Sequence, residues 1–141
     1  MSKHDVMVEA RSIVLSHEGE CFSDVLNSGS QVEVLIEGLI YALGYESVSR
    51  LHVNNEVNYQ AKLGSVGGVV LVFNMKSKSF HGDLRGSIES TFDLVMAVET
   101  ELDKALMYPK ELRENIIEDV VSRVGVSVDR YKTILKNWKF T

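Results

Sequence analysis

The stretch "SVSRLHVNNEVNYQAKLGSVGGVVLVFNM", residues 47–75, decides the fold, because apolar and polar residues alternate along much of it. The alternation is clearest in its middle segment, residues 57–63. One side of that segment carries only the apolar groups Val57, Tyr59, Ala61 and Leu63. A period of two is typical of a strand that buries one face and exposes the other to water. We therefore predict a half-buried strand at residues 57–63.

Two turn-like interruptions divide the stretch into three strands. Residues 54–56, "NNE", and the Gly-rich residues 64–68, "GSVGG", have the composition of hairpin turns. Short hairpin turns join strands that lie antiparallel and adjacent. The expected sheet is therefore a three-stranded antiparallel meander of residues 47–53, 57–63 and 69–75.

Apolar residues at helical spacing flank this sheet on both sides. The helical segments are residues 5–16, 31–43, 88–107, a segment that begins at Pro109 and one that begins at Ser127. In addition, a short turn of helix is expected near residues 22–26. The order of helices, meander and helices predicts a single α+β domain over residues 1–141. Its meander is flanked by two N-terminal and three C-terminal helices.

The segment 31–43 is apolar nearly all round, which predicts a central position in the fold or at an interface. Gly38 lies in its middle, where a glycine destabilises a helix by about 1 kcal/mol relative to alanine. We therefore expect another part of the chain to approach closely at Gly38.

Composition narrows the class of protein. The 141 residues carry a net charge of −5, which argues against a general nucleic-acid binder, because phosphate contacts need an excess of Lys and Arg. A single cysteine gives no sign of an oxidising compartment, and the N-terminus lacks the apolar core of a secretory signal. The longest apolar run, residues 69–73, is too short to span a bilayer. We expect a soluble, cytoplasmic protein of bacterial or phage origin that has no membrane partner.

The residues that could carry catalysis or metal binding are scattered. His17 and Cys21 in "HEGEC" are four apart, but a catalytic zinc needs three ligands and the other histidines lie elsewhere in the chain. Cys21 also lacks a local signature of a nucleophile paired with a base. The Gly-rich stretch 64–68 lacks the Lys of a phosphate-binding loop and leads into a strand. We therefore predict no catalytic residues, no metal and no cofactor, and an enzymatic role is less expected than a non-enzymatic one.

The segment "KSKSFHGDLRG", residues 76–86, is the best candidate for a small-molecule or enzyme site. It follows the most apolar strand, and loops after rigid strands commonly carry function. Its candidate ligand-binding residues are Lys76, Lys78, His81 and Arg85. Lys and Arg side chains that converge are suited to binding an anion, so this loop is one alternative site of function.

The C-terminal segment 117–137 resembles a helix-turn-helix, with Gly125 in the turn. The alternative function it predicts is that of a DNA-binding regulator. The nucleic-acid candidates on the second helix are Arg130, Lys132, Thr133 and Lys136. Against this reading, the position where the two helices would cross carries Val121 rather than a small residue, and Asp129 would repel phosphate.

The strand 69–75 predicts an interface, because it is apolar on both faces and would form an edge of the meander. An uncovered apolar edge invites aggregation unless a partner covers it. The interface candidates are Val70, Val72 and Phe73, and the economical partner is a second copy of the chain. We therefore expect a non-enzymatic protein-interaction module of inhibitor, immunity or adaptor type that acts as a homodimer.

Overall fold

The computed structural model describes residues 2–29, 31–102 and 109–138, and it confirms the expected α+β class. Three helices precede the sheet, namely α1 (Lys3–Ser16), α2 (Phe22–Asn27) and α3 (Val32–Ala42). The strands are β1 (Ser47–Val53), β2 (Glu56–Leu63), β3 (Val66–Asn74) and β4 (Ser79–His81). They are followed by α4 (Arg85–Ala97), the π-helix η1 (Val98–Leu102), α6 (Lys110–Val124) and α7 (Val128–Trp138).

The sheet is an antiparallel meander in the order β1-β2-β3-β4. The three long strands are those expected from the alternation, and β4 is an addition that forms inside the predicted loop 76–86. Val72 and Phe73 pair with His81 and Phe80. The prediction that the third strand forms an edge is therefore wrong where β4 covers it.

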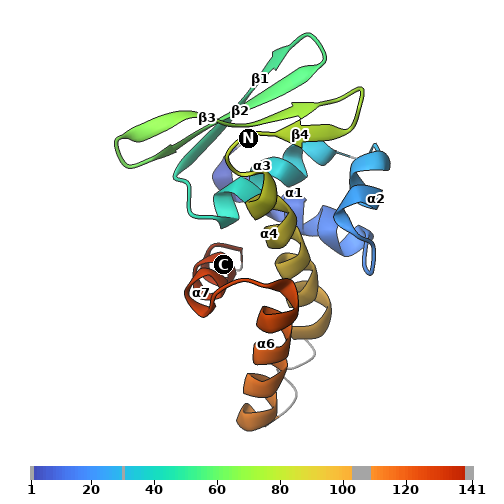
Figure 1. Ribbon diagram of the computed structural model, residues 1–141, viewed down its shortest axis with the longest axis vertical. Coiled ribbons are helices and arrows are strands. Elements are labelled where there is room, and N and C mark those ends of the chain that lie inside the picture. Colours follow the sequence, from blue (N-terminus) through green and yellow to red (C-terminus); the bar gives the residue numbers. More distant parts are fainter. Residues whose placement is uncertain (1, 30, 103–108, 139–141) are drawn as a thin grey trace.

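Helices lie on one side of the sheet, and its other side is open, as Figure 1 shows. The inner face carries Val57, Tyr59, Leu71 and Phe73, each at most 2% exposed. Alternation places Leu51 of β1 and Val72 of β3 on the open face. Val69 also lies on the open face, because the register shifts between Tyr59 and Gln60 and pairs Val69 with Gln60. The helix α3 lies under the sheet and is buried on nearly all its sides, which confirms its predicted central position.

The close neighbour expected at Gly38 is Ala10 of α1. A Cβ atom built on Gly38 would lie 2.4 Å from the Cβ atom of Ala10, closer than two side chains can approach. Gly38 therefore lets α1 and α3 pack with their backbones nearly touching, and this contact explains a glycine in the middle of a buried helix.

The predicted helix 88–107 changes character within its length. It is an α-helix to Ala97 and a π-helix over Val98–Leu102, and residues 103–108 lie outside the described part of the chain. Glu99 of the π-helix has a side chain only 2% exposed. Its Oε1 accepts hydrogen bonds from Arg11 Nε at 2.9 Å and from Trp138 Nε1 at 2.8 Å. One buried carboxylate thus joins α1, η1 and α7.

The helices α6 and α7 form the predicted C-terminal hairpin, with Gly125 in the left-handed conformation at its turn (φ 81°). Figure 1 shows α6 beside α4 on the side away from the sheet. Tyr131, Ile134 and Trp138 of α7 are buried against the body of the domain. Within the described residues, no helix has the length and apolarity needed to cross a membrane.

Candidate functional site

The predicted anion-binding loop 76–86 is divided between a turn, a strand and the start of a helix. Lys76 and Lys78 lie in the turn between β3 and β4, whereas His81 ends β4 and Arg85 begins α4. Since a strand rises about 3.3 Å per residue, β4 separates the two lysines from Arg85. The four side chains start from opposite ends of β4, so anion binding here stays a prediction that the geometry does not favour.

The four nucleic-acid candidates of α7 are exposed, but they do not share one surface. Arg130 and Thr133 line a cleft of about 340 Å³ against the end of the sheet, together with Leu63, Leu84 and other residues. Lys132 and Lys136 lie on the outward side of α7. Positive charge on the outward face of α7 is therefore limited to two lysines, and DNA binding stays a prediction.

The predicted interface residues of β3 differ in exposure. Phe73 is 2% exposed and belongs to the core of its own chain, whereas Val70 and Val72 are half-buried. The free side of Val70 is also occupied, because Leu84 N donates to Val70 O at 3.3 Å. A partner that extends the sheet at β3 would have to displace β4 and this segment.

His17 and Cys21 do not converge on a metal site. The ring of His17 pairs with Glu20, whereas the thiol of Cys21 lies 3.1 Å from Asp24 Oδ2. In the described residues, no group of three or more His, Cys, Asp or Glu side chains is arranged to hold a metal ion.

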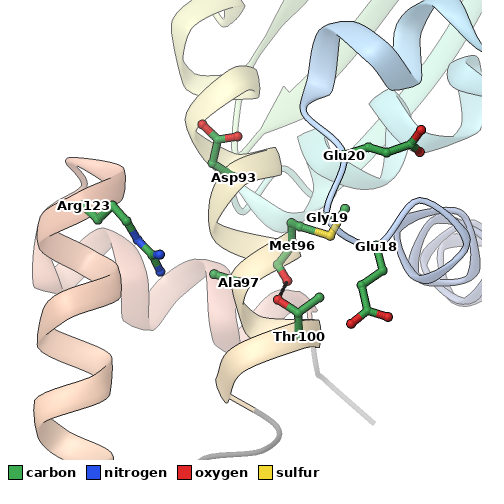
Figure 2. Close-up of a pocket in the computed structure, with 8 residues that line it drawn as sticks. All are labelled: Glu18, Gly19, Glu20, Asp93, Met96, Ala97, Thr100 and Arg123. Carbon is green, nitrogen blue, oxygen red and sulfur yellow. Dashed lines mark hydrogen bonds between the residues drawn. The ribbon is translucent and has the colours of Figure 1, made fainter.

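A cleft of about 310 Å³ lies between the turn after α1, the helix α4 and the end of α6. Figure 2 shows its charged residues: Glu18 and Glu20 from the turn, Asp93 from α4 and Arg123 from α6. The carboxylates of Glu18, Glu20 and Asp93 point in different directions, and Glu20 is already paired with His17. Burial, with the charge of Glu89, raises the pKa of Asp93. Because the charged groups diverge, this cleft has no common point for a ligand.

A cleft of about 430 Å³ at the outer edge of the sheet is lined by four charged or polar residues that do converge. Glu33 and Glu37 lie one turn apart on α3, and Arg50 and His52 lie two apart on β1. An i, i+4 spacing on a helix and an i, i+2 spacing on a strand each place two side chains on one face. The cleft is therefore formed where the face of α3 meets the inner face of β1.

Ion pairs connect the two sides of this edge cleft. His52 Nε2 lies 2.5 Å from Glu33 Oε1, and Arg50 Nη1 lies 3.7 Å from the same oxygen. Arg50 Nε lies 3.7 Å from Glu37 Oε2. Two carboxylates and one guanidinium leave one net negative charge in the cleft, before any charge on His52 is counted. On β2, next to β1, the buried hydroxyl of Tyr59 donates to the Glu33 carbonyl oxygen at 2.9 Å.

Glu37 is the most deeply buried charge of the cleft, with a side chain 9% exposed. Burial raises its pKa, and the nearby Arg50 guanidinium opposes this rise. Burial, reinforced by the charge of Glu33, likewise raises the pKa of Tyr59, so this phenol stays protonated as a donor. The edge cleft is thus a partly buried polar site with a net negative charge, which makes it the strongest candidate functional site of the chain.

Comparisons with protein-family models, with curated proteins and with solved structures find no match to this chain.

The residues of the edge cleft were not among the predicted site residues, although the sequence shows that each pair lies on one face of its helix or strand. Glu33 and Glu37 interrupt an otherwise apolar helix at i, i+4, and Arg50 and His52 stand on one face of a strand at i, i+2. The sequence does not show that the two pairs face each other, because this depends on how α3 packs under β1.

Proposed function

We propose that this chain is a protein-interaction module that forms a homodimer through the open face of its sheet. The observation that carries the proposal is a pair of exposed apolar columns on that face. Leu51 and Val53 of β1, 53% and 44% exposed, form one column, and Val69, 51% exposed, forms the other with Val72 of β3.

A polar column on β2 separates these two apolar columns. Asn58 pairs with Leu51 and Val72, and Gln60 pairs with Val69, so the two amides stand between the apolar side chains. A twofold axis parallel to β2 would lay β1 of one copy over β3 of the other. Each apolar column then meets an apolar column, and the amides meet amides, which carry both donors and acceptors. This self-complementarity favours a second copy over an unrelated partner.

The size of the face sets the expected strength of the dimer. Three strands about 4.8 Å apart and about 27 Å long present a flat patch of roughly 400 Å² per copy. Two such patches bury roughly 800 Å², which is below the range of about 1,200–2,000 Å² typical of stable interfaces. We therefore expect a weak dimer with a dissociation constant on the order of tens of micromolar.

Sedimentation equilibrium from about 5 to about 200 µM tests the proposal at concentrations on both sides of that constant. The parent should shift from monomer to dimer, and Leu51→Lys should remain monomeric because it places a charge in the apolar column. Val8→Lys is the matched control, since Val8 is equally exposed (53%) but lies on α1. A parent that stays monomeric throughout, or a Leu51→Lys variant that dimerises like the parent, would contradict the proposal.

A further inference from the structure

The outer side of β1 is a free sheet edge. Strand β1 pairs with β2 on one side, and no described strand lies on its other side. The hydroxyl of Tyr41 bonds to both Val48 N (3.2 Å) and Val48 O (3.4 Å), so these groups point away from β2. In an antiparallel strand this direction recurs at every second residue. The backbone N–H and C=O groups of Arg50 and His52 therefore also point to the free edge.

Directly below this edge lies the carboxylate of Glu37. Among the described residues its nearest cation is Arg50, whose Nε is 3.7 Å away, which is longer than a hydrogen bond. In the described part of the chain, we find no hydrogen bond to the Glu37 carboxylate. Buried polar groups are nearly always hydrogen-bonded, and a carboxylate accepts several bonds. A carboxylate that is nine-tenths buried and opens into a cleft is thus suited to a donor that enters from outside.

The charges of the edge cleft indicate which chemical group of a ligand would bind there. The net negative charge of Glu33, Glu37 and Arg50 favours a cation, and the oxygens of Glu37 require N–H donors. An ammonium or a guanidinium group meets both requirements. A metal ion carries no N–H donor, and in the described residues no group of three or more His, Cys, Asp or Glu side chains is arranged to hold one.

The free edge and the acidic cleft lie at the same two residues, Arg50 and His52. We propose that the β1 edge binds an extended basic peptide, which adds to the sheet as a fifth strand and places a Lys or Arg side chain in the cleft, where it donates to Glu37 beside Arg50. Strand addition supplies backbone hydrogen bonds to Arg50 and His52, while a pocket for alternate side chains supplies specificity. Side chains of an added strand alternate between the two faces of the sheet, so those directed toward α3 reach the cleft.

A fluorescein-labelled heptapeptide of alternating Thr and Val with a central Lys tests this proposal by fluorescence anisotropy. Matched peptides carry norleucine or Glu in place of the Lys. The Lys peptide should bind about tenfold more tightly than either, because only its ammonium group can donate to Glu37. Hydrogen exchange followed by NMR should show that the Lys peptide slows exchange at the amides of Arg50 and His52.

Two protein variants locate the cation. Glu37→Gln should weaken the Lys peptide by about tenfold and bring it to the level of the norleucine peptide. Glu114→Gln, an exposed glutamate on α6, removes the same charge away from the cleft and should leave the affinity within about twofold. Thermal melts establish that both variants are folded, and the amide-exchange measurement on the parent does not depend on either variant.

Three results would overturn the proposal. The first is equal affinity for the Lys and norleucine peptides, and the second is a Glu37→Gln variant that binds the Lys peptide like the parent. The third is binding of free spermidine as tight as that of the Lys peptide without protection of the Arg50 and His52 amides, which would indicate a site for free amines. Because the β1 edge and the open sheet face are different surfaces, failure here leaves the dimer untouched, and a monomeric parent leaves this proposal untouched.

Discussion

Gly38→Ala is expected to destabilise the fold even though alanine is the better helix former. The substitution gains about 1 kcal/mol of helix propensity. Against this, the new Cβ atom would lie 2.4 Å from the Ala10 Cβ atom, where ordinary contacts are 3.4–4 Å. Overpacking of a core typically costs about 1–3 kcal/mol, and here the upper end applies because a Cβ atom is fixed by the backbone and cannot change rotamer. We expect a net loss of about 2 kcal/mol.

Urea unfolding followed by the fluorescence of Trp138, the single tryptophan, measures this loss. Gly86→Ala is the matched control, because Gly86 lies in α4 with nothing within 4 Å of a built Cβ, and it should gain about 0.5–1 kcal/mol. The exchange Ala10→Gly with Gly38→Ala restores a single Cβ atom at the crossing and should return stability to within about 1 kcal/mol of the parent. A Gly38→Ala variant as stable as the parent, or a double variant no better than the single one, would refute the close crossing of α1 and α3.

Three further substitutions test other contacts. Trp138→Phe keeps an aromatic ring but removes the N–H donor to Glu99 together with part of the buried indole. Chemical denaturation should show a loss of at least about 1–3 kcal/mol, and an unchanged midpoint would mean that the bond contributes nothing. Gly82→Ala places a Cβ atom 2.8 Å from Val70 O at a φ of +129°, so amide exchange should show β4 opening, and intact protection of β4 would contradict this. Burial raises the pKa of Glu37 above the ordinary 4.5, so the folded state holds this proton more tightly than the unfolded chain does. The free energy of unfolding should therefore decrease as the pH rises above 4.5, because Glu37 loses its proton. Glu37→Gln should remove this part of the decrease, and parallel curves of stability against pH for the parent and the variant would contradict the prediction.

The alternation at residues 57–63 predicted the inner face of β2 correctly, because a period of two is a local property of the chain. Val57, Tyr59 and Ala61 are all at most 3% exposed. Leu63, the fourth apolar residue of the series, is 52% exposed, because it lies at the end of the strand. Local pattern therefore fixed the face, whereas the extent of burial depended on the packing partner.

The fourth strand could not be predicted from the sequence. It has three residues, and its Phe80 is the one residue of the three that is buried. So short a segment shows no period, and its pairing with Val72 and Phe73 is a tertiary contact. This missing strand is why β3 was expected to be an edge, and why we propose a dimer contact through the open face instead of one through Phe73.

Strand β1 has the apolar pair Leu51 and Val53 on the open face and the charged pair Arg50 and His52 on the inner face. A slip of one residue would reverse this arrangement and bury the apolar pair. Burial of two such side chains would gain roughly 1.5–3 kcal/mol each.

Two features of the structure oppose that slip. The slip would remove Arg50 from Glu37, and an uncompensated buried charge costs about 3–5 kcal/mol. It would also break both bonds from Tyr41 to Val48, each of which contributes about 1 kcal/mol. These terms together are about as large as the gain from burying Leu51 and Val53, so the contact of Arg50 with Glu37 helps to hold β1 in its register. The same register places Leu51 and Val53 on the open face, where we propose that a second copy binds, and turns Arg50 and His52 toward the edge cleft. The buried carboxylate of Glu37 therefore supports both proposed binding surfaces.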